Sequence, residues 1–304
     1  MSFAHETKAS LVAQSEAMKH DCCRRAELYG ILCSAGIFTR QKCKLVTTSV
    51  ELAELTVKWL GNLYNITGNL YITERRSGDE DERRSCKITL PQKKELERLF
   101  AGFRYEPEEP LWNIKREMFR CSGCEAAFVR GAFLSSGTLT DPDKGYHLEM
   151  SVPTPELADS LASLLTDAGL EPKRMIRKNE NVLYYKDSES IENFLAYIGA
   201  NTAVFTIMNK KIERGIRSDV NRIANGEMHN LGKTAAAAAD QIAAINALMA
   251  DGELERLPDE LRQTAYLRLE NREATLSQLA EMHNPPITKS GVNHRLKKLM
   301  EWGK

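Results

Sequence analysis

The small and hydrophobic positions of this chain follow a pattern that occurs twice. Residues 22–38 read CCRRAELYGILCSAGIF and residues 123–139 read GCEAAFVRGAFLSSGTL, and their small residues coincide when the two are aligned. In the first copy Ala26, Gly30 and Cys33 recur at helical spacing, so each copy predicts a helix with one face of small residues. Such a face permits close approach of another backbone, and two copies of this length indicate a duplicated supersecondary unit rather than a solenoid.

The segments around the two copies predict the same order of elements in each half. The first half shows a β-rich segment, an amphipathic helix, two short strands and a closing helix, at residues 44–50, 51–64, 70–73, 86–90 and up to Phe103. The second half shows a strand, a helix capped by Thr154, a hairpin and a closing helix, at residues 146–152, 155–168, 171–186 and 188–198. One more short strand fits after the glycine that ends each repeat.

The composition of the chain changes after Ile207. The next residues are basic, with cationic side chains that can contact phosphates: Lys210, Lys211, Arg214, Arg217 and Arg222. A run of alanines beginning at Ala235 then predicts a helix through Ala250, because alanine is the best helix former. We interpret residues 207–256 as a basic, Ala-rich helical linker.

The last segment carries a helix-turn-helix pattern. A helix over residues 261–269 is followed by a short helix over 276–282, a break at 283–286 and a basic helix that runs to Met300. The second helix of such a motif enters the major groove, which makes these the candidate DNA-binding residues: Thr275, Thr288, Lys289, Ser290, Asn293, His294, Arg295, Lys297 and Lys298. The simpler alternative is a small helical bundle whose basic face is only solvated.

Charge and composition leave the partner open. Lys plus Arg and Asp plus Glu both total 42 in the 304 residues, so the net charge is zero and does not indicate or exclude nucleic acid. The N-terminal residues lack a signal-peptide pattern and no apolar run is long enough to span a bilayer, so we expect a cytoplasmic protein without a membrane partner.

The seven cysteines are an odd number, which argues against a fully paired disulfide framework. Cys121 and Cys124 form a C-x-x-C motif, which suits half of a zinc site or a redox pair. Cys22 and Cys23 offer a second pair, but adjacent residues are poorly placed to direct two thiolates at one metal. We therefore favour cysteines that fill buried space, and we expect neither a metal nor a cofactor.

The repeated helices resemble the LAGLIDADG motif of homing endonucleases, with residues 28–36 and 129–137 as the two copies. A closer resemblance is to the WhiA family of bacterial transcription regulators. It rests on CCRRAEL, RGAFLSSGTL, YHLEM, VNRIANGEMHNLGKT, LPDELRQTAYLRLENREATLSQLAEM and ITKSGVNHRLKKL, which span nearly the whole chain.

The resemblance implies an α+β fold in which a pseudo-twofold, LAGLIDADG-like duplicated α-β-β-α-β-β-α domain precedes an all-α helix-turn-helix domain. The expected domains are two halves over residues 1–110 and 111–206, the linker over 207–256, and the helix-turn-helix domain over 257–304. The implied function is sequence-specific binding of double-stranded promoter DNA in the nucleoid. Its implied role is control of cell division, chromosome segregation and, in spore-forming relatives, sporulation.

In the endonucleases an acidic residue before the final glycine of each motif holds a divalent metal, but Ala35 and Ser136 occupy those positions here. The resemblance therefore implies a fold without catalytic residues. A metal-dependent endonuclease is the alternative, disfavoured by Ala35 and Ser136: Asp141 and Asp143 follow the second motif, but the first has no acidic counterpart at its end. A third hypothesis assigns the first domain to binding another regulatory protein or a small ligand. Arginines 75, 76, 83 and 84 offer a further DNA surface, although the acidic residues among them favour a solvated loop.

Overall fold

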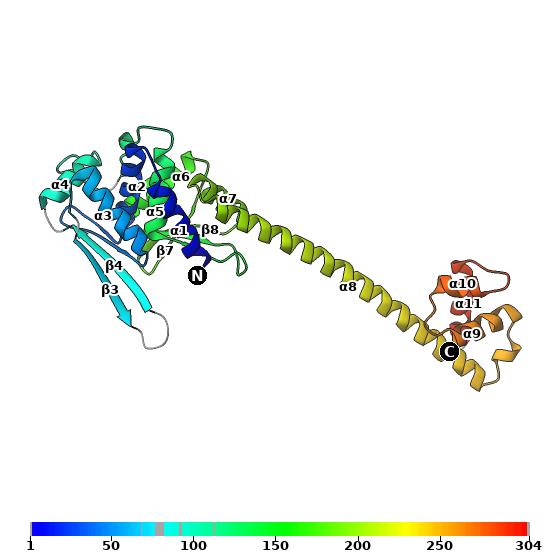
Figure 1. Ribbon diagram of the computed structural model, residues 1–304. Helices are drawn as coiled ribbons and strands as arrows, with labels where there is room; N and C mark the ends of the chain where they lie inside the picture. Colours follow the sequence, from blue (N-terminus) through cyan, green and yellow to red (C-terminus); the bar gives the residue numbers. More distant parts are fainter. Residues whose placement is uncertain (1, 68, 77–81, 91–92, 112, 303–304) are drawn as a thin grey trace. The chain divides into compact units, whose positions relative to one another are not determined.

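The computed structural model describes residues 2–67, 69–76, 82–90, 93–111 and 113–302. The chain divides into two units, residues 1–212 and 213–304, and helix α8 (Asn201–Ala250) belongs to both (Figure 1). Unit 1 begins with α1 (Phe3–Glu16) and consists of two halves of like topology. Unit 2 holds α8 from Glu213 onward and a group of short helices.

Each half of unit 1 has the order α-β-β-α-β-β-α. The first half consists of α2 (Asp21–Cys33), β1 (Ile37–Phe38), β2 (Cys43–Thr47), α3 (Val50–Tyr64), β3 (Asn69–Arg76), β4 (Glu82–Leu90) and α4 (Lys93–Gly102). The second half consists of α5 (Cys124–Ser136), β5 (Gly137–Leu139), β6 (Leu148–Val152), α6 (Pro155–Asp167), β7 (Lys173–Arg177), β8 (Glu180–Tyr185) and α7 (Ser188–Tyr197). The predicted α+β duplication is confirmed.

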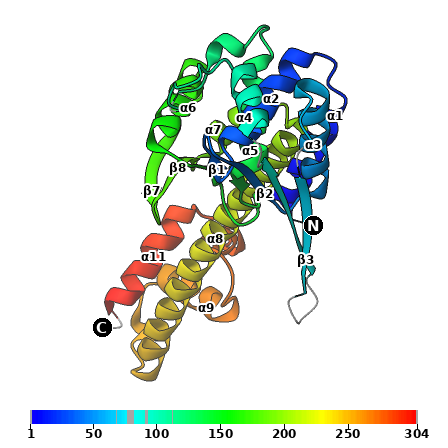
Figure 2. The same ribbon diagram turned by 90° about the vertical axis from the view of Figure 1, so that its left-hand side faces the viewer.

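Each half folds around its own antiparallel sheet. The strand orders, β1-β2-β4-β3 and β5-β6-β8-β7, are equivalent in the two halves. Figure 2 shows α1, α3 and β3 on one side of unit 1 and α6, β7 and β8 on the other, with α2 and α5 between them. The buried side chains of both halves join in one hydrophobic core.

Local sequence sets the helices that cover the sheets. The Ser49 hydroxyl accepts a hydrogen bond from the Leu52 amide at 3.1 Å and so caps α3. The Thr154 hydroxyl does the same for the Leu157 amide at 3.3 Å in α6, and Pro155 occupies the first turn, where a missing amide costs nothing. The Thr154 cap lies where the sequence predicts it.

The two repeat helices, α2 and α5, cross in direct backbone contact. A Cβ atom on Gly30 would lie 2.0 Å from the Phe128 carbonyl oxygen, and one on Gly131 would lie 2.1 Å from the Glu27 carbonyl oxygen. Both distances are far inside van der Waals contact, so only glycine fits either position. Phe128 and Glu27 occupy equivalent places in the two repeats, which makes the contact symmetric.

A buried ion pair joins the same two helices. Glu27 of α2 is fully buried, and its Oε2 atom accepts hydrogen bonds from Nε and Nη2 of Arg130 of α5 at 2.9 and 2.7 Å. The Ser15 hydroxyl of α1 donates to the other carboxylate oxygen at 2.5 Å. Breaking such a pair on one side leaves an uncompensated buried charge, so the ion pair fixes how the halves dock.

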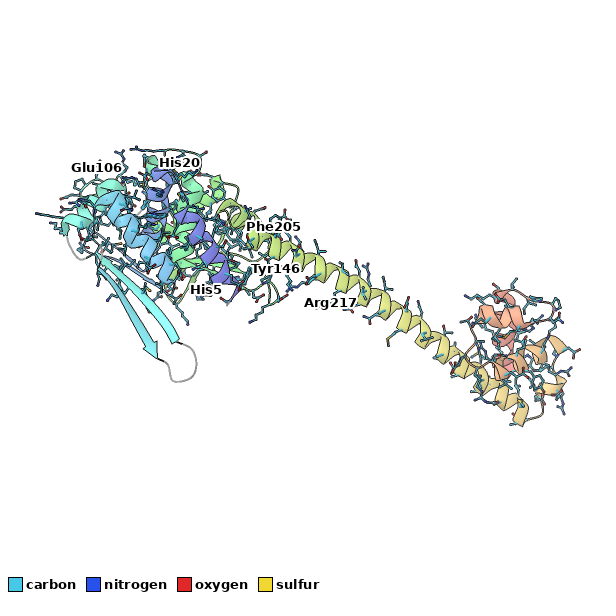
Figure 3. The ribbon with its side chains drawn as sticks, viewed as in Figure 1. His5, His20, Glu106, Tyr146, Phe205 and Arg217 are labelled. Carbon is cyan, nitrogen blue, oxygen red and sulfur yellow. The ribbon has the colours of Figure 1, made fainter. Side chains whose placement is uncertain are left out.

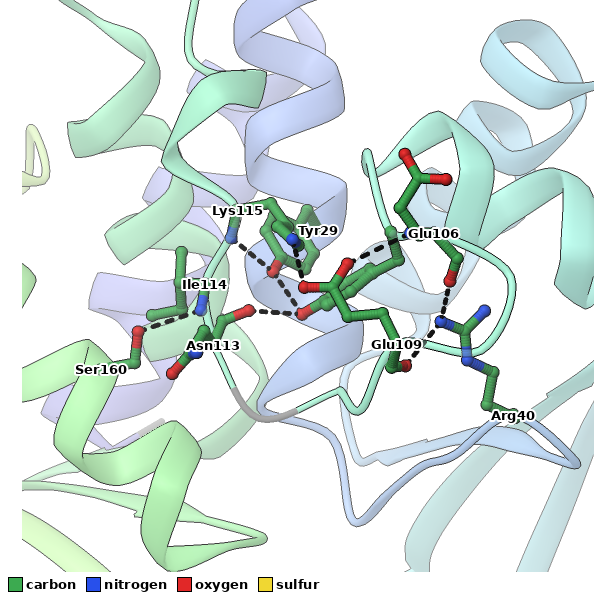
Figure 4. A network of polar contacts seen from close by, with 9 residues as sticks. Tyr29, Arg40, Glu106, Glu109, Asn113, Ile114, Lys115 and Ser160 are labelled. Atoms are coloured by element: carbon green, nitrogen blue, oxygen red, sulfur yellow. Dashed lines mark hydrogen bonds and ion pairs between the residues drawn. The ribbon is translucent and has the colours of Figure 1, made fainter.

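The connection between the halves is held by the polar network in Figure 4. The Lys115 amide donates to the Tyr29 hydroxyl at 3.1 Å, and the Tyr105 hydroxyl donates to the Asn113 carbonyl at 2.7 Å. The two hydroxyl oxygens are 2.8 Å apart. Because the Tyr105 hydroxyl already donates its one hydrogen to Asn113, the Tyr29 hydroxyl is the donor and the Tyr105 oxygen the acceptor in this bond. Arg40 closes the same turn through the Glu109 carbonyl at 2.7 Å.

Several elements differ from the predicted lengths, among them α8, which begins at Asn201 and not at the alanine run. Strands β3 and β4 are paired from Asn69 and Thr89 to Arg76 and Glu82, well beyond the short strands expected at residues 70–73 and 86–90. The added parts of both strands consist mostly of charged residues. They lack the alternation of apolar and polar residues that is the main sequence signal for a strand. The side chains of Arg75, Arg76, Arg83 and Arg84 lie outside the described part of the structure, as do residues 79–81.

Unit 2 has its own hydrophobic core. After α8 come a 3-10 turn (Leu254–Arg256), α9 (Asp259–Glu270), α10 (Leu276–Met282) and α11 (Lys289–Trp302). The core includes Ile245 and Leu248 from α8 together with Leu279, Val292 and Leu296. Residues that the sequence assigned to the linker therefore complete the core of the C-terminal helices.

The glycine contact gives the first prediction. Gly30→Ala should destabilise unit 1 by about 3 kcal/mol, the upper end of overpacking costs, because the added methyl meets backbone that cannot rotate away. Gly36→Ala is the matched control, since a Cβ there meets no atom within 4 Å. Urea unfolding followed by tryptophan fluorescence measures both variants, and equal midpoints for Gly30→Ala and Gly36→Ala would contradict the close helix crossing.

Candidate nucleic-acid interface

Helix α11 is the second helix of the predicted helix-turn-helix, and its start is set by Thr288. The Thr288 hydroxyl accepts a hydrogen bond from the Gly291 amide at 3.1 Å, and its carbonyl accepts from the Val292 amide at 3.1 Å. Helix α10 starts with a capping box, in which Thr275 and Gln278 each bind the other's backbone amide. Thr275 and Thr288, both expected at the DNA surface, thus also serve as helix caps.

Two faces of α11 have opposite character. Val292, Leu296 and Leu299 are fully buried and pack into the unit 2 core. The opposite face carries exposed polar or cationic side chains: Lys289, Ser290, His294, Lys297 and Lys298. Asn293 lies at the edge of this face and is half-buried. Seven of the nine predicted DNA-binding residues are therefore exposed, six of them on or next to α11 and Thr275 at the start of α10.

Arg295 is placed differently from the other predicted residues. Its side chain is 19% exposed, and its Nη2 atom lies 3.0 Å from a carboxylate oxygen of Glu260 in α9. Glu260 itself is largely exposed, at 74%. Arg295 therefore lies between α9 and α11 and holds the two helices together. Sequence reasoning missed this role because Glu260 is remote along the chain and no periodic signal links the two positions.

A second buried contact orients the break between α10 and α11. His283 lies buried in that break with its Nε2 atom 3.3 Å from the Thr264 hydroxyl of α9. Burial, reinforced by the charge of Arg295, lowers the pKa of His283 below its usual value. The neutral imidazole is therefore the form that the folded unit accommodates.

Arg268 supports the start of α10 from inside the unit. Its side chain is 2% exposed, and its Nη1 atom donates to the Ala274 carbonyl at 2.7 Å, one residue before the Thr275 cap. Burial lowers the pKa of this guanidinium, which nevertheless stays protonated at neutral pH. Together with the His283 contact, this bond fixes both ends of α10 to α9.

The basic stretch of α8 forms a polar surface within unit 2. Arg214, Arg217, Asn221 and Arg222 share one side of the helix with Ser218 and Asn225. Arg217 projects from the helix in Figure 3, and Arg222 lies 3.2 Å from Asp219 on the same helix. The two lysines at the start of the stretch belong to unit 1 and form ion pairs within it. Lys210 lies 3.3 Å from Asp143, and Lys211 lies 3.7 Å from Glu192.

The C-terminal ends of the repeat helices carry neutral side chains. Ala35 follows α2 and is buried, and the Ser136 hydroxyl at the end of α5 donates to the Ala132 carbonyl at 3.0 Å. A cation also contacts this end of α5, since Nζ of Lys8 donates to the Leu134 carbonyl at 3.1 Å. Burial lowers the pKa of Lys8 to about 8. An amine at a helix C-terminus suits the helix dipole but offers nothing to a divalent cation.

These features define a class of protein: a duplicated α+β unit of LAGLIDADG type, followed by a helical unit with a helix-turn-helix. Family models match both parts, described as the WhiA LAGLIDADG-like domain over residues 125–217 and the WhiA C-terminal HTH domain over residues 220–302.

The relatives extend over the whole chain. A probable cell division protein WhiA of Alkaliphilus metalliredigens is 34% identical, covering 98% of this chain and 96% of the relative. Its counterpart in Desulfitobacterium hafniense is 33% identical, covering 99% and 95%. The crystal structure of full-length WhiA from Thermatoga maritima matches with a TM-score of 0.57 at 25% identity, covering 100% and 98%. The chain belongs to the WhiA family.

Among the helices that the structure describes within residues 2–302, none combines the length and the apolar character needed to cross a bilayer.

The contacts of His283 predict a pH dependence of unit 2. In the unfolded chain His283 takes up a proton near pH 6.5, whereas in the folded unit its pKa is lower, so the unfolded state binds more protons just below pH 6.5. Stability should therefore be constant above about pH 6.5 and fall below it, by at most about 1.4 kcal/mol per pH unit.

Hydrogen–deuterium exchange of peptides from α9 to α11, corrected for intrinsic rates, measures this loss as the pH is lowered. His283→Gln should remove the part of the slope that His283 contributes. His294→Gln, at an exposed histidine of α11, is the matched control and should leave it in place. An unchanged slope in His283→Gln would contradict the interpretation.

Proposed function

We propose that this protein is a sequence-specific DNA-binding transcription regulator without nuclease activity, linked to cell division and chromosome segregation. The observation that carries the proposal is the exposed polar face of α11, held by two capped helices in a domain of the WhiA helix-turn-helix type. The names of the relatives, which are cell division proteins, support the biological context. Double-stranded promoter DNA in the nucleoid of the cytoplasm is the proposed partner.

The residues of α11 divide into two groups by their chemistry. Ser290, Asn293 and His294 carry groups that can donate to or accept from base edges, and they lie in the N-terminal half of the helix, which enters the major groove in such motifs. Lys289, Lys297 and Lys298 are flexible cations suited to phosphates. The Thr275 and Thr288 hydroxyls stay candidates for phosphate contacts near the helix starts.

Arg295 acts in this proposal as a positioning residue. Its guanidinium forms an ion pair with Glu260, and its positive charge acts on buried His283. Replacing Arg295 should therefore disturb the packing of α9 on α11. Loss of base discrimination would then follow from a displaced helix. This assignment replaces the base contact that the sequence pattern alone suggests.

The basic side of α8 extends the proposed interface within unit 2. Arg214, Arg217 and Arg222 share one side of that helix with two asparagines, a composition typical of contacts to a phosphate backbone. Unit 1, with neutral ends on its repeat helices, is left free to bind another regulatory protein or a small ligand.

The first test concerns the lysines of α11. The double variant Lys297→Ala/Lys298→Ala should bind promoter fragments more weakly. If both lysines contact phosphate, its slope of log affinity against log salt should be smaller by about 2. The DNA comes from immunoprecipitation of the native protein from its own cells, and fluorescence anisotropy measures binding.

Arg256→Ala provides the matched control for lost positive charge. Arg256 is exposed in the turn before α9, away from α11 in the sequence, and pairs with Glu253 at 2.8 Å. It should change the salt slope by less than one lysine does. An unaltered affinity in the double lysine variant, with its fold intact by circular dichroism, would exclude α11 as the DNA-reading helix.

The second test concerns catalysis. The purified protein should not cleave bound promoter DNA with Mg²⁺ or Mn²⁺, because Ala35 and Ser136 supply no carboxylate at the helix ends. Gel analysis of supercoiled and linear substrates measures this. Metal-dependent cutting that persists through purification and disappears in Asp141→Asn would establish the nuclease alternative.

A further inference from the structure

The structure brings together four cysteines that are far apart in the sequence. Cys22 and Cys23 lie in the first turn of α2, while Cys121 and Cys124 flank the start of α5. Their sulfur atoms all lie within 4.8 Å of one another. This cluster stands at the N-terminal ends of the repeat helices, where Figure 3 labels His20, the residue before α2.

The sulfur–sulfur distances fit one tetrahedral ion. Cys121 Sγ lies 3.3 Å from Cys23 Sγ, 3.6 Å from Cys22 Sγ and 3.5 Å from Cys124 Sγ. Four thiolates at about 2.3 Å from a zinc ion stand about 3.8 Å from each other. An iron–sulfur cluster places several atoms between its cysteines and would need them further apart. A disulfide needs only two cysteines, at a sulfur–sulfur distance of about 2 Å.

The backbone around the cluster is shaped for close approach of the sulfurs. Cys121 and Cys124 are joined by a turn in which the Cys124 amide donates to the Cys121 carbonyl at 3.1 Å. A Cβ on Gly123, inside this turn, would lie 3.6 Å from Cys23 Sγ and 3.9 Å from Cys121 Sγ. The turn therefore faces the sulfur of Cys23 across the boundary between the two halves.

The cluster lies at the N-terminal ends of two helices, where the positive end of the helix dipole stabilises a nearby thiolate. Burial acts in the opposite direction and raises the pKa of Cys22 and Cys23, so bound metal would have to displace their protons. Cys23 and Cys124 are buried, Cys22 is half-buried and Cys121 is exposed, so an ion has an entry path through the Cys121 side. The adjacency of Cys22 and Cys23 is no obstacle, because successive positions in a helical first turn both reach the cluster.

We propose that Cys22, Cys23, Cys121 and Cys124 form a structural zinc site that clamps the two halves of unit 1 together. Zinc binds four thiolates, the thiol protons that remain pass to solvent, and no electrons are transferred. The ion closes the coordination shell, so the site is structural rather than catalytic. The site goes beyond the proposed DNA binding and does not depend on it.

Metal analysis of the full chain tests the proposal. Protein purified anaerobically with a reductant should contain about one zinc per chain by inductively coupled plasma mass spectrometry, a closed four-ligand site holding one ion. After the zinc is replaced by cobalt(II), the absorption spectrum should show the intense visible bands of tetrahedral cobalt together with thiolate-to-metal charge transfer.

Cys121→Ser removes an exposed ligand without altering the core. It should weaken zinc binding by at least about 100-fold in a chelator competition. Replacing a residue that only hydrogen-bonds to a metal ligand already lowers metal affinity by about 10- to 100-fold, and Cys121 is a ligand itself. Cys33→Ala is the matched control, since Cys33 is buried at the other end of α2, and it should keep the zinc. The melting temperature should fall on chelation in the native chain but not in Cys121→Ser.

Several results would overturn the proposal. A chain free of metal after growth and reconstitution with zinc would do so, as would equal zinc affinity in Cys121→Ser and the native protein. Bound iron in place of zinc would refute the assignment of the ion. Peptide mapping that finds Cys121 in a disulfide with Cys22 or Cys23 under the same conditions would show a redox pair instead.

Discussion

The contact between α2 and α5 is the constraint on which unit 1 depends. Gly30 and Gly131 each face a carbonyl of the other helix, with no room for a side chain. Since the two helices meet backbone to backbone, every other element of the two halves must pack outside this pair. The sheets accordingly lie on either side of it, each with the same strand order. The duplication in the sequence is therefore a duplication of the surface that makes the contact.

The symmetry of that contact is broken by side chains rather than by the backbone. Glu27 meets Gly131 through its carbonyl and Arg130 through its carboxylate. The equivalent residue of the second repeat, Phe128, also presents its carbonyl to a glycine, but its ring packs 5.0 Å from the ring of Tyr29. Tyr29 in turn enters the hydroxyl network that holds the connection between the halves. A buried ion pair on one side and an aromatic pair on the other therefore make the two sides of the contact chemically different.

Local signals made much of the fold predictable, and contacts between distant residues set the limit. The cap at Thr154, the small-residue face and the helix-turn-helix all follow from short-range rules, and their elements lie where expected. The ion pair of Arg295 could not be predicted in this way. The position of Arg295 on α11 suggested an exposed side chain, whereas it is largely buried and paired with Glu260 of α9. The convergence of the cysteines could not be predicted for a related reason, because the contact between the two halves brings Cys121 and Cys124 beside Cys22 and Cys23. Strand β3 was underestimated because its charged residues conceal the alternation.

The two ends of the α2–α5 pair now have distinct chemistry. At the C-terminal ends stand Ala35 and Ser136, and Lys8 contacts the last carbonyls of α5, so this end lacks the carboxylates that divalent metal catalysis requires. At the N-terminal ends four thiols converge, in a place where the helix dipoles favour negative charge. A soft cation binds thiolates and a hard one binds carboxylates, so the two ends of the helix pair offer different ligands to metal ions. The helix pair thus serves as a scaffold, while the exposed face of α11, in a unit with its own core, is free to contact DNA.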